Sequence, residues 1–172
     1  MKNLLVLLIL LSVPVLVGSK TDSPGFVGKI WPSEKKIVEN KLGYEVTQWT
    51  TNSRNWHLYF NVESFIDDSS AVMYSDRTGE TNLFRLNLYN GQMTQMTNES
   101  HIKSEVWHLS GYKTIWYFNG DTLKALNTLT LQSKPVYVFT GYIPISFSVT
   151  CDAKYFVFST NKNPGYTDKC TS

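Results

Sequence analysis

"SDRTGETNLFRL", residues 75–86, places a polar turn directly before a run in which apolar and polar residues alternate. The turn contains Asp76 and Arg77, and the alternation begins at Leu83 and surrounds Arg85 with apolar neighbours. A period of two is typical of a β-strand. The stretch therefore predicts the turn of a β-hairpin followed by its second strand, and we interpret Asp76 and Arg77 as a salt bridge within that hairpin.

The surrounding pattern repeats along the chain at a nearly constant interval. Three stretches that read as short buried strands are AVMYS at 71–75, TIWYF at 114–118 and YFVFS at 155–159, and they begin 43 and 41 residues apart. Turns such as Asn90-Gly91 and Asn119-Gly120 follow the first two stretches, and no helical periodicity intervenes. A period of about 40–45 residues predicts four-stranded β-propeller blades, whereas the strands of a β-sandwich need no fixed spacing.

We therefore expect an all-β chain that forms an incomplete ring of about three propeller blades, each of four antiparallel strands. We interpret the chain as a truncated gene product or a fragment rather than as a self-sufficient small ring, because four blades are the usual minimum. The expected divisions are a signal peptide at 1–19, a lead-in segment at 20–43 and a partial propeller at 44–172, with blades near 57–97, 101–140 and 142–172.

The first twenty residues have the organisation of a secretory signal peptide. Lys2 precedes an apolar run at 4–17, and the small residues Gly18 and Ser19 follow it. A membrane-spanning helix needs about 20 apolar residues, and Pro14 interrupts this shorter run. We expect cleavage after Ser19 and export, either as a secreted or as a periplasmic protein, with no stable membrane span.

Composition narrows the classes of partner and site. The formal net charge is +2 and no basic run occurs, so the sequence does not favour a nucleic-acid partner. In an oxidising compartment Cys151 and Cys170 are candidates for a disulfide, whereas two thiols without further nearby ligands make a poor zinc site. Asn98 begins an Asn-Glu-Ser pattern, which matters only if the source glycosylates exported proteins.

The segment 57–97, HLYFNVESFIDDSSAVMYSDRTGETNLFRLNLYNGQMTQMT, resembles the first blade of the oligogalacturonate lyases. The second half of this segment also resembles TolB-like propellers. The stretches HLYF and SF in its first half make the resemblance more specific to the oligogalacturonate lyases. SVTCDAKYFVFSTN at 148–161 is similar to another blade start of the family. The resemblance covers most of residues 44–161 and implies a seven-bladed propeller that cleaves short pectin fragments. Seven blades would need about 300 residues.

The chemistry that this resemblance implies is a β-elimination. A base removes the proton at C5 of a galacturonate unit, the glycosidic oxygen leaves from C4, and a cation neutralises the neighbouring carboxylate. The resemblance implies manganese as that cation, held by histidines and a glutamine in later blades, where the catalytic histidine also lies. We therefore expect no cofactor site within these 172 residues, and the catalytic residues stay unassigned.

Three residues are candidates for contacting a substrate. His57 opens the HLYF word and matches a family position that would face the central channel, and the alternative is a histidine that hydrogen-bonds a neighbouring loop. Arg54 and Arg77 offer bidentate guanidinium groups for a uronate carboxylate, with structural roles as the alternative.

The remaining histidines and the tryptophans favour structural interpretations. His101 and His108 flank Glu105 without the spacing of a metal motif, and we expect them to be surface or strand residues. We expect the tryptophans to pack between blades, with stacking on sugar rings as the alternative. They are Trp31, Trp49, Trp56, Trp107 and Trp116.

Two functions from different classes stay open. The first is the N-terminal portion of a secreted oligogalacturonate lyase-like enzyme that is inactive as this chain alone. The second is a TolB-like propeller module that binds a protein or a carbohydrate without catalysis. The expected partner is an oligogalacturonide or another carbohydrate, and an incomplete ring would leave a sheet edge open for pairing with another chain.

Overall fold

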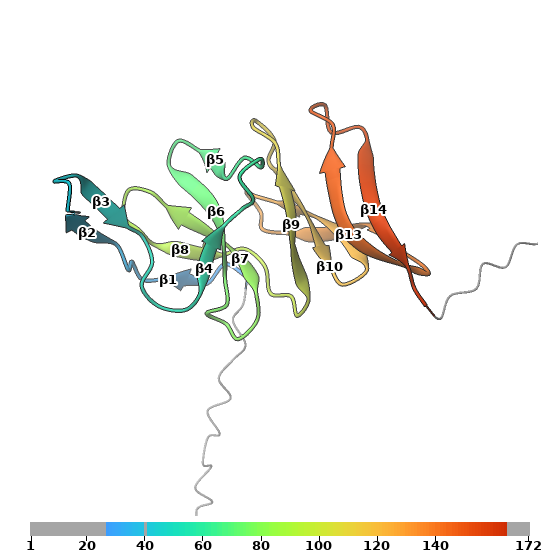
Figure 1. The fold of residues 1–172 in the computed structure, drawn as a ribbon, viewed down its shortest axis with the longest axis horizontal. Helices are drawn as coiled ribbons and strands as arrows, with labels where there is room; N and C mark the ends of the chain where they lie inside the picture. Colours follow the sequence, from blue (N-terminus) through green and yellow to red (C-terminus); the bar gives the residue numbers. More distant parts are fainter. Residues whose placement is uncertain (1–26, 40, 165–172) are drawn as a thin grey trace, which may run out of the picture.

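The computed structural model of the protein describes residues 27–39 and 41–164, and the predicted signal peptide lies outside them. The described residues form β-strands joined by turns and loops, without a helix. None of the described elements is therefore a helix long and apolar enough to cross a membrane. Figure 1 shows successive sheets arranged side by side, from the hairpin β2–β3 at one end to β14 at the other.

Fourteen antiparallel strands build four sheets within the described residues. They are β1 (Ile30–Trp31), β2 (Lys36–Glu39), β3 (Glu45–Gln48), β4 (Asn55–His57), β5 (Phe65–Asp67), β6 (Ser70–Ser75), β7 (Asn82–Asn87), β8 (Met93–Gln95), β9 (Ile102–His108), β10 (Thr114–Asn119), β11 (Thr122–Asn127), β12 (Ser133–Val138), β13 (Tyr142–Val149) and β14 (Phe156–Lys162).

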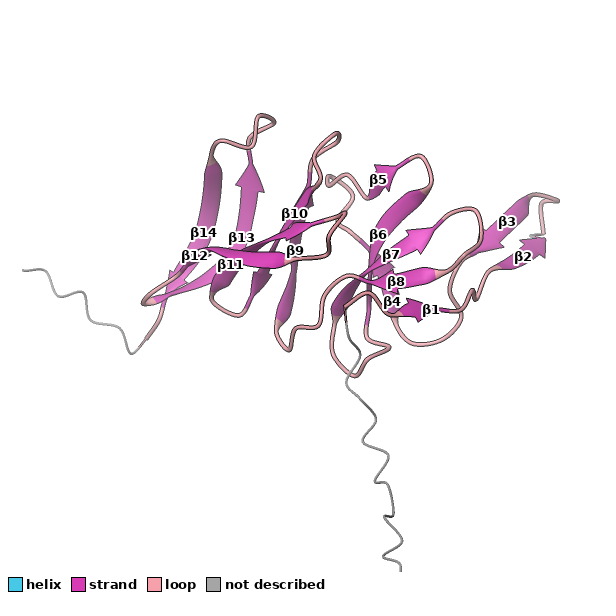
Figure 2. Ribbon diagram, turned by 180° about the vertical axis from the view of Figure 1, so that it is seen from behind, coloured by secondary structure: helices cyan, strands magenta, loops and turns pink. Residues whose placement is uncertain are grey.

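The predicted repeat is confirmed. The first sheet has the order β1-β8-β7-β6-β4, with β5 also paired to β6, the second has the order β12-β11-β10-β9, and the third is β13-β14. The strands β6, β10 and β14 contain the three repeated stretches except for Tyr155, and they lie in three different sheets, each paired with a strand at one edge of its sheet. Those edge strands, β4, β9 and β13, follow one another across Figure 1, whereas β11 and β12 are seen from behind in Figure 2.

The first sheet takes in more of the chain than four strands. Its innermost strand is divided into β4 and β5, which both pair with β6 and are separated by an excursion at 58–64. At the opposite edge β1 pairs with β8, so that Trp31 lies opposite Met93. The segment expected to lead into the propeller therefore supplies an extra edge strand. A strand of two residues is too short to show the apolar–polar alternation from which a strand is predicted.

Successive residues of a central strand bury opposite faces. In β10, Ile115 and Tyr117 belong to the core between the first and second sheets, where Tyr74 of β6 meets them. Trp116 and Phe118 belong to the core between the second and third sheets. Because side chains alternate across a strand, one apolar run supplies both cores, which is the packing of propeller blades.

The first sheet also has an apolar face that points away from the second sheet. Met73, Phe84, Leu86 and Met93 form a third buried cluster there. Three partly buried side chains from the surrounding segments pack against this cluster; these are Trp31, Trp49 and Leu88. Cover of this face therefore comes in part from the N-terminal segment.

Glu99 joins the first sheet to the second through hydrogen bonds. Its backbone N–H donates to Asn82 Oδ1 at 2.8 Å. Its carboxylate accepts from the Tyr117 hydroxyl at 2.9 Å, the Asn119 amide at 2.7 Å and Lys124 Nζ at 2.5 Å. Charge-assisted bonds of this kind are stronger than neutral ones, so Glu99 fixes the connection between β8 and β9.

Gly91 lies where the N-terminal segment packs closely on the first sheet. Its φ is +74°, and a Cβ there would lie 2.3 Å from Ser33 Oγ and 2.9 Å from Lys35 Cβ. Gly79 also has a positive φ, +91°, but a Cβ there meets nothing within 4 Å. We expect Gly91→Ala to lower the free energy of unfolding by about 1–3 kcal/mol more than Gly79→Ala, because only Gly91→Ala adds a collision to the backbone strain. Urea unfolding measures both losses, and equal losses would contradict this packing.

Candidate functional site

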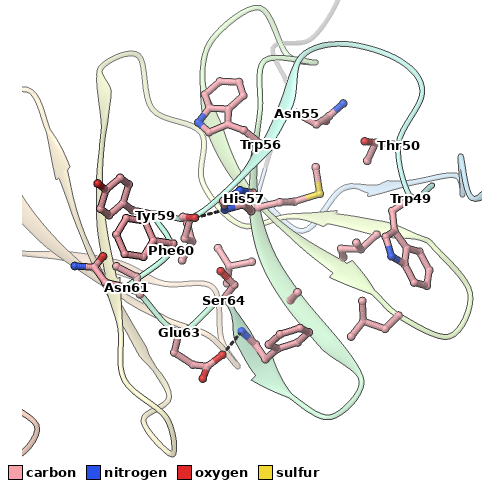
Figure 3. Close-up of a pocket in the computed structure, with 18 residues that line it drawn as sticks. Trp49, Thr50, Asn55, Trp56, His57, Tyr59, Phe60, Asn61, Glu63 and Ser64 are labelled. Carbon is pink, nitrogen blue, oxygen red and sulfur yellow. Dashed lines mark hydrogen bonds between the residues drawn. The ribbon is translucent and has the colours of Figure 1, made fainter. Parts of the chain in front are cut away.

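A cavity of about 930 Å³ lies against the apolar outer face of the first sheet. Residues 71–73 of β6 and the side chains of Leu86 and Leu88 border it on the sheet side. Residues 55–65 form one wall, and Trp49 and Thr50 form another (Figure 3). The fold therefore brings four separate segments, 49–50, 55–65, 71–73 and 86–88, to one cavity.

The excursion between β4 and β5 explains the exposed aromatic rings of this cavity. Leu58 and Val62 are buried in the core between the first and second sheets, and the Val62 N–H donates to the Tyr59 carbonyl oxygen at 2.9 Å. Tyr59 and Phe60, in contrast, are 63% and 81% exposed, with ring centroids 4.5 Å apart. Two apolar anchors thus hold a short loop that displays two aromatic rings at the rim.

His57 borders the cavity, and its contact with a substrate stays a prediction. It is the last residue of β4, its side chain is exposed, and its Nδ1 contacts the carbonyl oxygen of Leu58 (Figure 3). A neutral ring that donates from Nδ1 presents Nε2 as a hydrogen-bond acceptor. His57 therefore bonds the adjacent backbone and also borders the cavity.

The predicted salt bridge between Asp76 and Arg77 is wrong. Asp76 Oδ2 instead accepts from Arg54 Nε at 2.9 Å, and the Arg54 side chain is 86% exposed. Arg77 pairs with Glu34, with 3.0 Å between Nη1 and Oε1. Residues that follow one another at the end of a strand point in different directions, so each finds its own partner. Neither arginine borders the cavity, and the structure does not bring them together with His57.

Arg77 is buried and engaged through all three guanidinium nitrogens. Its side chain is 4% exposed. Besides Glu34, it donates from Nε to Ser75 Oγ at 3.0 Å and from Nη2 to Asn55 Oδ1 at 3.1 Å. The guanidinium carbon also lies 5.5 Å from the centre of the Trp31 ring. This geometry favours the structural role that the sequence left as the alternative for Arg77.

The other histidines lie where a structural role was expected. His101 is exposed, and its Nδ1 is 2.7 Å from Ser100 Oγ. His108 ends β9 and is buried, with Nε2 donating to the Tyr112 carbonyl oxygen at 2.9 Å. Between them burial raises the pKa of Glu105, a shift that no sequence pattern indicated.

The tryptophans divide into three environments. Trp107 and Trp116 pack in the core between the second and third sheets, as predicted. Trp31 and Trp49 cover the outer face of the first sheet. Trp56 borders the cavity and stacks on Tyr74, with 5.4 Å between ring centroids.

One of the two cysteines falls within the described residues. Cys151 is exposed in the turn between β13 and β14, and Cys170 lies outside the described residues. Their disulfide stays a prediction. Asn98 is exposed just after β8, a position that a glycan would require.

No family model matches the chain, and no curated protein matches it. Among solved structures, an oligogalacturonate lyase from Vibrio parahaemolyticus matches with a TM-score of 0.68 and 18% identity over 74% of this chain and 36% of that lyase. An oligogalacturonate lyase in complex with manganese matches with a TM-score of 0.69 and 20% identity over the same shares. The chain has the fold of the oligogalacturonate lyases. It spans about a third of the length of these two lyases, and the predicted resemblance is confirmed for the fold.

One of these two lyases is in complex with manganese. Within 27–39 and 41–164, no three His, Cys, Asp or Glu side chains converge as metal ligands. His57 ends β4, His101 directly precedes β9 and His108 ends β9. No catalytic step through a metal follows from this part of the lyase-like fold.

Glu34 makes the fold sensitive to acid. Burial alone raises the pKa of Glu34, but hydrogen bonds from the Asn52 and Thr51 N–H groups and the charge of Arg77 outweigh it, so the pKa lies below its ordinary value of 4.5. A carboxyl group with a lowered pKa stabilises the fold above its ordinary pKa and loses that contribution as the pH falls through the lowered value. We expect the loss of unfolding free energy in Glu34→Gln to be largest near neutral pH and to shrink below about pH 4.5.

Urea unfolding of both proteins at neutral pH and at several acidic values measures this difference. The pKa values of Asp67 and Asp76 are also lowered, by hydrogen bonds from Ser69 and Arg54 respectively. Both carboxylates are present in the wild type and the variant, so their effects cancel in the comparison. A difference that stays constant with pH would contradict a charged, paired Glu34.

Proposed function

We propose that this chain supplies the first three sheets of an exported oligogalacturonate lyase-like propeller that acts on short pectin-derived oligogalacturonides. The supporting observation is the match of its consecutive sheets to two oligogalacturonate lyases at TM-scores of 0.68 and 0.69. The position of His57 beside an open aromatic cavity in the first sheet adds to this support.

Catalysis in this proposal depends on residues outside the described part. β-Elimination beside a carboxylate needs a base and a charge neutraliser that converge on one substrate carbon. Among the residues bordering the cavity, His57 is a candidate base and Glu63 is an anion, whose Oε1 accepts from the Phe65 N–H at 2.8 Å. A carboxylate at this position repels a uronate, so the cavity residues do not make a complete lyase site.

A binding module without catalysis is the second candidate function. The exposed Tyr59 and Phe60 rings favour it, since aromatic rings bind the apolar faces of ligands and need no reacting groups. The two candidates differ in the turnover expected of a longer protein that includes this chain, because only the lyase portion predicts activity there.

The 172-residue protein should not turn over digalacturonate or trigalacturonate, with or without added manganese. The reason is the missing convergence of base and cation among the described residues. Ultraviolet absorbance of the unsaturated product measures turnover, and calorimetry measures trigalacturonate binding. His57→Ala tests the cavity, and His101→Ala, on an exposed residue outside it, is the matched control.

Each result separates the candidates. Turnover that His57→Ala abolishes and His101→Ala preserves would overturn the expectation of inactivity. Binding without turnover, weakened only by His57→Ala, would favour the binding module. Absence of binding and turnover in this chain, with turnover by a longer protein that includes it, would support the lyase portion.

Export gives a separate prediction for the cysteines. If residues 1–19 direct export, Cys151 and Cys170 reach an oxidising compartment and should form a disulfide. Thiol titration of the exported, denatured protein should then detect no free thiol, and reduction should lower the unfolding free energy by about 3 kcal/mol. Two free thiols in protein recovered from the exported fraction would contradict the pairing.

A further inference from the structure

The loop 49–55 forms a wall of the cavity and has an unusual backbone. Trp49, Thr50 and Asn55 border the cavity. Ser53, between them, has a φ of +64°, in the left-handed region that residues other than glycine rarely adopt. A loop with this conformation needs surrounding contacts that hold it in place.

Two side chains hold the loop from within the protein. Glu34 Oε2 accepts from the backbone N–H groups of Thr51 at 2.7 Å and of Asn52 at 3.0 Å. Asn55 Nδ2 donates to the carbonyl oxygens of Asn52 at 2.8 Å and of Ser53 at 3.0 Å. Glu34 therefore fixes the donors of the loop, and Asn55 fixes its acceptors.

Arg77 binds both of these side chains with one guanidinium. Nη1 donates to Glu34 Oε1 at 3.0 Å, and Nη2 donates to Asn55 Oδ1 at 3.1 Å. The ring of Phe84 lies 5.4 Å from its guanidinium carbon, on the outer face of the first sheet. The planar fork of an arginine suits two acceptors at once, which a lysine would not satisfy in the same way.

We propose that Arg77 is a positioning residue that sets the 49–55 wall of the cavity through Glu34 and Asn55, without touching a ligand itself. This inference rests on the proposed function only in taking the cavity as the ligand site. It gives the polar turn that contains Arg77 a role in shaping the site. Arg77 would then act indirectly and not by direct contact with a uronate.

Arg54 offers a matched control on the same loop. Its side chain pairs with Asp76 at the exposed side. The Arg54 N–H also donates to Asp76 Oδ1 at 2.8 Å, and the Asp76 N–H donates to the Arg54 carbonyl oxygen at 3.2 Å. Neither of these two bonds depends on the guanidinium. Arg54→Met therefore removes one charged contact of the loop and leaves the Arg77 contacts intact.

Amide hydrogen exchange of the 172-residue protein tests the proposal. In Arg77→Met, exchange at the Thr51 and Asn52 amides should accelerate at least tenfold relative to the amides shared by β6 and β7. Glu34→Gln, which keeps the shape and removes the charge, should give the same local effect and serves if Arg77→Met does not fold. Arg54→Met should leave both amides at the wild-type rate.

The outcomes distinguish positioning from general stabilisation. Unchanged exchange at Thr51 and Asn52 in both Arg77→Met and Glu34→Gln, or equal acceleration throughout the first sheet, would overturn the proposal. Trigalacturonate titration of the same variants adds the link to the site. If the wild type does not bind trigalacturonate while the local acceleration is observed, the proposed substrate fails and the positioning role of Arg77 stands.

Discussion

Each central strand of this fold has to bury both of its faces, and the rest of the structure depends on that requirement. The second sheet meets it with neighbours on both sides, since Tyr117 faces the first sheet and Phe118 faces the third. The first sheet has the second sheet on one face, and among the described residues side chains such as Trp31 and Trp49 cover parts of the other. The cavity lies on this second face. The candidate site is thus a direct consequence of how blades stack.

The repeat was readable from the sequence because it is local. Apolar runs such as 71–75 and 114–118 carry the period of two within a few residues, and glycines at the turns, including Gly91 with a φ of +74°, mark where each hairpin reverses. The extra edge strand β1 was not predictable, because its pairing with β8 depends on residues about sixty positions later. Nothing within a strand of two residues indicates a partner so far along the chain.

The site was predictable only in part, for a related reason. The HLYF word led to His57, which does border the cavity, because the word contains both the end of β4 and the start of the exposed excursion. The arginines were assigned by residue type alone. Asp76 and Arg77 are adjacent in sequence, yet their partners Arg54 and Glu34 come from earlier segments that reach the turn only in the folded chain. Partner choice among charged residues is therefore a tertiary property.

The two charged pairs at this turn differ in how much stability the fold would lose without them. The Arg54–Asp76 pair is exposed, and such pairs contribute about 0–1 kcal/mol because water and salt screen them. Arg77 and Glu34 are 4% and 10% exposed, and removing one partner of a buried pair costs about 3–5 kcal/mol because the other charge stays desolvated. Arg54 belongs to the segment before β4, and Glu34 accepts hydrogen bonds from Thr51 and Asn52 of the same segment. The position of that segment therefore depends much more on the buried pair, and one wall of the cavity depends on it as well. The turn that contains Arg77 thus determines the shape of the site although it carries no reacting group.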